Sequence, residues 1–250
     1  MRLLKRQRTK RKGRFSDFLH FFLVAALPVL LFVLVRLEFV GFAFIVILLS
    51  KWRMIAVKTR HWPANIRSNA VDILFGLSMV VFMSIVSSQL LQVGIVASYI
   101  MWLLFIKPKS SDLWVGLQAL IAQTVSLTAI FLIWNEASET MLTFVVWGVT
   151  YLCARHFLAA FDEAMARASA YAWAFFAASL TWLSSHWLLY YKVISQPALI
   201  ITVVGYGMAA LYYLQHKDRL SKGVQRQFIS LMVAVVLFIL VFSDWSGDII

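Results

Sequence analysis

Acidic and histidine side chains that could act as general bases or metal ligands stand at the ends of apolar runs. His156 and Glu163 are seven residues apart, so they would share one face of a helix. Asp72 and Asp112 stand at the starts of two other apolar runs. Carboxylates gathered at one membrane surface could hold a metal ion or activate water for attack on a lipid phosphate. The catalytic candidates are therefore Asp72, Asp112, His156, Asp162 and Glu163.

A solvated helix end with surface ion pairs explains the same residues without any chemistry. The sequence has no G-x-S-x-G, H-E-x-x-H, P-loop or G-x-G-x-x-G motif. Its five histidines lack the spacing of metal ligands, so neither a metal site nor a cofactor is expected. The single cysteine, Cys153, lies in an apolar run and is expected to be a small packed side chain.

A second stretch whose residues could bind a ligand runs from Lys51 to Asp72. It contains five basic residues together with Trp52 and Trp62, and no acid precedes Asp72. Cations mixed with indoles are typical of a membrane–water interface that faces anionic lipid. Generic attraction to an anionic surface explains this composition, and so does a specific site at the start of the following helix. The residues predicted to bind a phosphate-bearing lipid headgroup are Arg53, Lys58, Arg60, His61 and Arg67.

Two similar serine-containing stretches, residues 84–91 and 181–188, end the third and seventh apolar runs. Their hydroxyl side chains recur four residues apart, which places them on one helix face. Hydrogen bonding between helices is one role for them, and a shared polar pocket near the outer leaflet is another. The residues predicted to line such a pocket are Ser84, Ser88, Gln89, Thr181, Ser185 and His186.

Composition excludes a water-facing globule. The 250-residue chain is 62% hydrophobic with only 14% charged residues, and its mean hydropathy is +0.83. The net charge of +12 would suit nucleic acid, but the cations stand at the ends of apolar runs instead of in a folded domain. The partners we expect are therefore membrane lipids with anionic headgroups, and membrane proteins, but not nucleic acid.

Transmembrane helices are expected to hold these residues in place. The sequence predicts an all-α polytopic membrane bundle of about nine helices, because runs of about 20 apolar residues recur along the chain. The predicted helices are 16–35, 38–50, 63–91, 95–106, 113–134, 140–160, 168–191, 197–214 and 227–243. The second and fourth are short enough to be tilted or re-entrant segments. The domain organisation is a basic cytoplasmic tail (1–15), one helix bundle (16–245) with a basic loop (51–69), and a short outer tail (246–250).

The placement of the cations predicts the orientation. With nine crossings and a cytoplasmic N-terminus, every Lys and Arg except Arg36 and Lys192 falls on the cytoplasmic side. This distribution follows the positive-inside rule. We therefore expect a multi-pass protein of the plasma or inner membrane whose C-terminus lies outside.

Small residues predict how the bundle packs. Alanines recur every four residues on the seventh helix, and a second alanine set lies beside them, so this helix is expected to pack on more than one side. Gly205 and Ala209 on the eighth helix, and Gly116 and Ala119 on the fifth, are expected to pack in the same way. The two sets on the seventh helix are Ala166, Ala170, Ala174 and Ala178, and Ala164, Ala168 and Ala172.

No charge is predicted near the middle of the bilayer, which disfavours an ion-coupled transporter. We therefore expect a non-enzymatic membrane protein, either a membrane-embedded subunit or scaffold or a carrier of an uncharged or lipid-like substrate. In either role its basic cytoplasmic face would bind anionic lipid. The alternative is an integral membrane enzyme that acts on a phosphate-bearing lipid at the cytoplasmic leaflet.

Overall fold

The computed structural model describes residues 14–54, 56–134, 137–161, 163–185, 190–191 and 194–243. Within these ranges it contains nine α-helices, three short helical turns and one two-residue antiparallel ladder. The α-helices are α1 (Arg14–Arg36), α2 (Val40–Ser50), α3 (Trp62–Ile85), α4 (Gln89–Met101), α5 (Asp112–Ile133), α6 (Glu139–Ala160), α7 (Ala166–Ser185), α8 (Gln196–His216) and α9 (Lys222–Phe242). The turns are η1 (Trp52–Met54) and η2 (Thr59–His61), both 3₁₀, and the π-helical η3 (Trp102–Ile106). The ladder pairs β1 (Tyr190–Tyr191) with β2 (Ile194–Ser195). The all-α fold class is confirmed.

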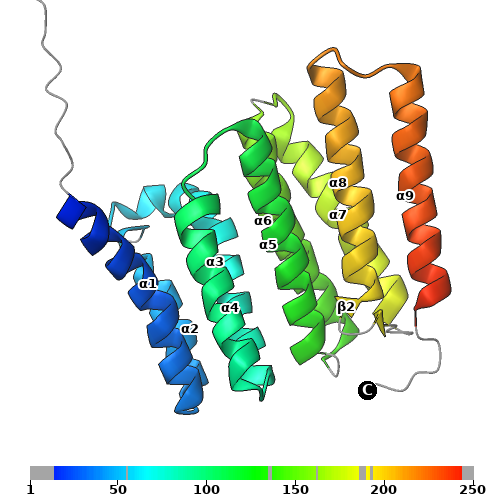
Figure 1. Cartoon of the computed structure of the whole chain (residues 1–250). Helices are drawn as coiled ribbons and strands as arrows, with labels where there is room; N and C mark the ends of the chain where they lie inside the picture. The colour runs from blue at the N-terminus through cyan, green and yellow to red at the C-terminus, as the bar shows by residue number, and fades with distance from the viewer. Residues whose placement is uncertain are drawn as a thin grey trace, which may run out of the picture.

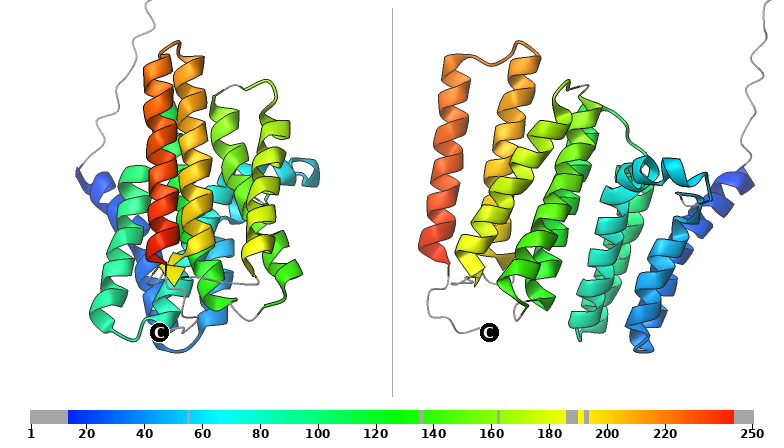
Figure 2. Two further views of the ribbon diagram at one scale, coloured as in Figure 1. Left: turned by 90° about the vertical axis from the view of Figure 1, so that its right-hand side faces the viewer. Right: turned by 180° about the vertical axis from the view of Figure 1, so that it is seen from behind.

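Successive α-helices run in opposite directions, from α1 and α2 at one side of the molecule to α8 and α9 at the other (Figure 1). The turns after α2, α4 and α8 lie at the upper end of this view and carry Lys51, Lys107 and Lys217. We call this the basic end, and the opposite end the far end. The two views in Figure 2 show the same alternation from the side and from behind.

The centre of the bundle is formed by α3, α5 and α6. Their inward side chains, such as Met79, Leu127 and Val146, are buried in one continuous apolar cluster. The first alanine set of α7 is buried, which agrees with close packing of α7 against α6 through these small side chains. α7 contacts both α6 and α8, as expected, but the second alanine set, Ala164, Ala168 and Ala172, is exposed.

Six helices are long and apolar enough to cross a membrane, by length and composition and within the described residues. The candidate spans are Thr59–Ile85, Gln89–Ile106, Asp112–Ile133, Glu139–Ala160, Gln196–His216 and Lys222–Phe242. The apolar helices Phe21–Arg36 and Val40–Ser50 are shorter, and α7 is rich in alanine and serine. The structure therefore indicates a membrane protein, and crossing of the bilayer by all nine helices stays a prediction. The outer tail 246–250 and most of the basic tail lie outside the described residues.

The boundary between α3 and α4 differs from the predicted one. Residues 63–91 were expected to form one helix, but α3 ends at Ile85 and α4 already begins at Gln89. The buried Gln92 explains the early ending, because its Nε2 donates to the carbonyl oxygens of Met83 (2.9 Å) and Val86 (2.8 Å). It thus supplies partners to carbonyl groups that the end of a helix leaves free.

Serine side chains begin three of the helices. The hydroxyls of Ser138, Ser195 and Ser221 accept a hydrogen bond from the backbone N–H three residues later, at the starts of α6, α8 and α9. With Ser221 as its cap, α9 begins at Lys222 and not at the predicted residue 227. Asp112, at the start of an apolar run, is the first residue of α5 and follows Ser111.

Candidate functional site

An ion cluster around the buried Asp72 joins three segments at the basic end. The Oδ2 atom of Asp72 accepts from the ammonium groups of Lys51 and Lys107, the latter at 2.6 Å, and its Oδ1 accepts from Trp102 Nε1 at 3.0 Å. Asp72 is 8% exposed. The Trp102 indole is buried and stacks on Phe75, with ring centroids 4.0 Å apart. We call these four residues, Lys51, Asp72, Trp102 and Lys107, the Asp72 cluster.

The π-helical turn η3 explains why two donors from one segment reach the same carboxylate. In an α-helix, two side chains that are five residues apart point in directions about 140° apart around the helix axis. In η3 the amide of Lys107 instead bonds to the carbonyl of Trp102, five residues back, at 2.9 Å. This wider turn brings both side chains toward the same face. Gln118 holds the turn from α5 through hydrogen bonds from its Nε2 to the carbonyl oxygens of Ile106 and Lys109, each at 2.8 Å.

The Asp72 cluster carries two cations and one anion. Burial lowers the pKa of the Lys51 ammonium, the neighbouring Lys107 adds to this shift, and Asp72 opposes it. A buried carboxylate is costly unless it is paired and hydrogen-bonded. Each oxygen of Asp72 has at least one donor, so the cluster joins the end of α2, α3 and the turn before α5.

The predicted headgroup residues lie on a surface loop beside this cluster. Arg53, Lys58, Arg60 and His61 are exposed, and Arg67 is half-buried on α3. The loop is tied to the bundle by hydrogen bonds from Trp62 Nε1 to the Val57 carbonyl (3.1 Å) and from Asn65 Nδ2 to the Met54 carbonyl (3.3 Å). Arg60 Nε also bonds to His61 Nε2 at 2.9 Å. The loop therefore presents a concentrated positive surface at the basic end.

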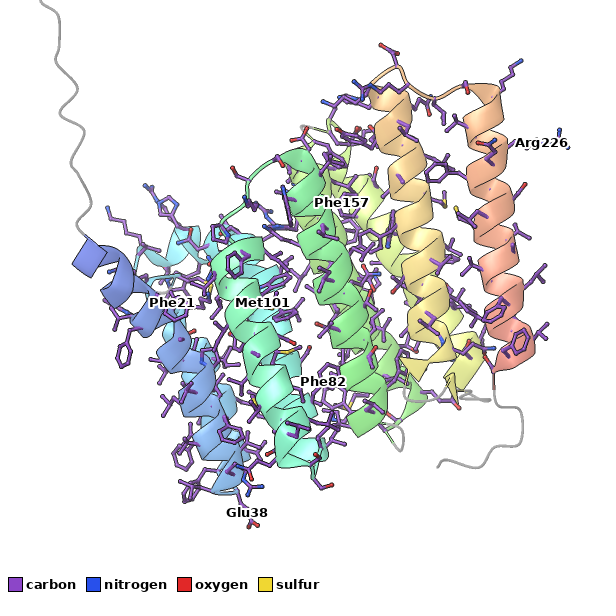
Figure 3. All side chains as sticks on the ribbon, in the orientation of Figure 1. Phe21, Glu38, Phe82, Met101, Phe157 and Arg226 are labelled. Atoms are coloured by element: carbon purple, nitrogen blue, oxygen red, sulfur yellow. The ribbon has the colours of Figure 1, made fainter. Side chains whose placement is uncertain are left out.

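A cavity of about 400 Å³ opens between α5, α6, α8 and α9, close to the basic end. Its volume falls within the range of about 300–1,000 Å³ typical of small-molecule sites. We call it the α5–α8 cavity. Its lining is Asp112, Leu113, Gly116, Leu117, Leu120, Phe157, Phe161, Tyr206, Ala209, Ala210, Tyr213, Leu214 and Phe228. Phe157, labelled in Figure 3, is buried on α6, whereas Leu113 and Leu117 are exposed, so the cavity opens on the bundle surface.

Small residues and one hydrogen bond give the cavity its shape. Thr124 of α5 and Thr202 of α8 are joined by their hydroxyls at 3.2 Å, one helical turn beyond the lining residues Leu120 and Tyr206. Toward the basic end Gly116 faces open space, with no atom within 4 Å of where a Cβ would stand. Gly116 and Ala209, expected to pack closely, therefore line the cavity. Gly205 is the close contact on α8, against the Trp173 indole.

The mouth of the cavity is polar. An adjoining hollow of about 170 Å³ shares Asp112, Phe161 and Tyr213 with the cavity and adds Ala160, His216 and Lys217. Asp112 Oδ2 and Lys217 Nζ are 3.6 Å apart, and the Lys217 ammonium lies 5.6 Å from the centroid of the Tyr213 ring. The site is thus amphipathic, with hydrocarbon walls inside the bundle and charges at the surface.

Several polar groups near the centre of the bundle lack a partner within the described part of the chain. The Gln123 side chain is fully buried, and neither its amide nitrogen nor its oxygen is hydrogen-bonded. The hydroxyl groups of Thr150 and of the cavity residue Tyr206 are likewise buried without a hydrogen-bond partner in this part of the chain. His156 Nε2 is also buried and unpaired.

The catalytic candidates that the structure describes have different partners. Asp72 lies in the Asp72 cluster, Asp112 pairs with Lys217, and Glu163 Oε1 accepts from the Met165 amide at 3.2 Å. Asp162 lies outside the described residues, and His156 lies on α6. Among the described residues no group of three or more His, Cys, Asp or Glu side chains is placed to hold a metal ion.

The residues of the predicted polar pocket are only partly described. Ser84 lies on α3, but Ser88 precedes α4, so the two do not share a helix face. Gln89 is exposed at the start of α4, and Thr181 is buried and donates to the carbonyl of Ala177 at 2.8 Å. His186 and the side chain of Ser185 lie outside the described residues.

Sequence reasoning missed the partners that define both sites. In the sequence, Lys51, Lys107 and Lys217 count only as determinants of orientation. The available signal was the isolated acid Asp72 next to a basic loop, since a lone acid at membrane depth requires a cation nearby. Comparison of the chain with protein-family models, with curated proteins and with solved structures finds no match.

Proposed function

We propose that this chain is a non-enzymatic multi-pass membrane protein that holds one hydrocarbon chain of a lipid in the α5–α8 cavity. It would act as a carrier of a lipid-like molecule or as a lipid-binding subunit of a membrane assembly. The proposal includes nine crossings of the plasma or inner membrane, with the basic end in the cytoplasm. The loop with Arg53, Lys58, Arg60, His61 and Arg67 would then rest on anionic headgroups.

The observation that carries the proposal is the amphipathic form of the cavity. Its walls are apolar, its rim is open beside Leu113 and Leu117, and its charged groups stand at the end of the bundle. An apolar void leaves the atoms that line it without contacts on one side. In a bilayer the neighbouring molecules are lipid chains, so a lipid chain is the natural occupant.

The enzymatic alternative requires acids that converge on one cavity. Of the described candidates, only Asp112 lines the α5–α8 cavity, and Asp72 and Glu163 have separate partners. No observation within the described residues favours it over the lipid-binding proposal.

Substitution of Gly116 with leucine tests the proposal by filling the cavity from the α5 wall. Native mass spectrometry of the purified protein with added dipalmitoyl phospholipid is expected to give at least about tenfold less retained lipid than wild type, or about 1.4 kcal/mol. Gly148→Leu is the matched control, because Gly148 also has open space at its Cβ but lies on α6 away from the cavity. Its lipid retention should stay at the wild-type level.

Ala209→Leu, from the opposite wall, repeats the test if Gly116→Leu does not give a monodisperse protein. Equal retention by the cavity variants and by Gly148→Leu would contradict the proposal.

A further inference from the structure

The mouth of the α5–α8 cavity carries one charge of each sign on opposite walls. Among the described residues of the cavity and mouth, Asp112 is the one acid and Lys217 the one lysine or arginine. Asp112 belongs to α5, whereas Lys217 follows α8, so the charges flank the opening. His216 lies beside Lys217, and its ring stacks on Tyr212.

The Asp112–Lys217 pair is loose. The two charged atoms are 3.6 Å apart, longer than a charge-assisted hydrogen bond, and both side chains are more than 40% exposed. Exposed pairs of this kind contribute little to stability. A ligand that offers a better partner to each charge could therefore separate them at small cost.

Three further acids at the basic end have different surroundings. Asp72 is held by two lysines and an indole, and Glu163 bonds to the backbone. Asp218 lies in the turn between α8 and α9, outside the cavity and its mouth. Asp112 is thus the acid that a headgroup at the mouth would meet.

We propose that the mouth selects a phospholipid whose headgroup carries both a phosphate and a primary ammonium group. The phosphate would lie against Lys217 and His216, and the ammonium group would donate hydrogen bonds to Asp112. This inference rests on the proposed lipid-binding function. A headgroup with only negative charge satisfies Lys217 but places an anion near the Asp112 carboxylate. The charges of the mouth therefore complement a zwitterionic aminophospholipid better than an anionic one.

Competition between two lipids with identical acyl chains tests the selection. Wild-type protein is mixed with equal amounts of phosphatidylethanolamine and phosphatidylglycerol, and the retained lipids are counted by native mass spectrometry. We expect phosphatidylethanolamine to be favoured several-fold. Asp112→Asn should reduce this ratio to near one, Asp112→Glu should keep it, and Lys217→Gln should weaken retention of both phospholipids relative to diacylglycerol.

Asp218→Asn is the matched control, because it removes an exposed acid from the same end but not from the mouth. Asparagine also tolerates the left-handed backbone found there, with φ of 52°. This variant should keep the wild-type ratio. No preference in wild type, or an unchanged preference in Asp112→Asn, would overturn the headgroup inference while cavity binding stands. Retention that is insensitive to Gly116→Leu would instead overturn the proposed function.

Discussion

Replacement of Asp72 with asparagine is expected to destabilise the protein by about 3–5 kcal/mol, as for other buried ion pairs that lose one partner. The substitution leaves the ammonium groups of Lys51 and Lys107 facing an uncharged amide. Trp102 keeps an acceptor only if the amide oxygen takes the place of Oδ1. The three segments that meet at Asp72 would then lose their common anchor.

The single cysteine provides the measurement. Cys153 is fully buried, so a thiol-reactive fluorophore labels it only as the bundle opens on heating. At about 2–4 °C per kcal/mol for a chain of this size, Asp72→Asn should lower the Tm by about 10 °C. Asp112→Asn is the control, because its partner is half-exposed and a surface pair contributes about 0–1 kcal/mol.

A triple variant shows whether the loss of stability in Asp72→Asn comes from unpaired charge or from loss of packing. Replacing Asp72 with leucine and both lysines with methionine removes all three charges, and such exchanges in other proteins are often neutral or stabilising. This triple variant should recover the part of the lost stability that is due to unpaired charge, but not the about 1–3 kcal/mol that a buried Trp102 Nε1 without an acceptor costs. If the Asp72→Asn variant had the same Tm as wild type, the Asp72 cluster would not anchor the three segments.

Substitution of Gly205 with alanine is expected to cost about 1–3 kcal/mol through overpacking. An added Cβ would stand 2.8 Å from Trp173 Cε2 and closer still to Cζ2. The rigid indole cannot move aside easily, because it packs edge-on against Phe157 and Tyr206 with ring centroids 5.6 and 5.9 Å away. The contact between α7 and α8 must therefore open.

Gly207→Ala is the matched control two residues further along α8. Its Cβ would also meet atoms at short range, but they belong to the flexible side chain of Met232 on α9. A change of less than about 1 kcal/mol is expected, since methionine can adopt another rotamer. The same thiol-labelling melt compares the two variants. Equal losses of Tm would mean that indole rigidity is not what makes Gly205 necessary.

Most helices could be predicted from the sequence, because long apolar runs end at charged or capping residues. The predicted 113–134 and 140–160 match α5 and α6 within one residue at each end. The end of α3 was misjudged since hydropathy does not reveal that the Gln92 side chain caps its carbonyl groups. A nine-helix all-α bundle was foreseen, whereas only six of the described helices meet the length and composition of a full crossing.

The sites were harder to predict because they depend on contacts between distant segments. The partners of Asp72 lie 21, 30 and 35 residues away in the sequence, and the π-helical turn that orients Trp102 and Lys107 has no simple sequence signature. Gly116 and Ala209 look like packing positions in sequence. Only the crossing of α5 and α8 at Thr124 and Thr202 shows that they line a cavity instead.

The location of a bound lipid chain tests the account most directly. The protein would be reconstituted with phosphatidylethanolamine that carries a photoreactive diazirine in one acyl chain, irradiated, digested and mapped by mass spectrometry. We predict that the strongest labelling falls on the cavity segments 113–120 of α5 and 206–214 of α8, and that Gly116→Leu abolishes it. Labelling spread evenly over α1 and α9, at the two sides of the bundle, and unchanged by Gly116→Leu, would contradict the account.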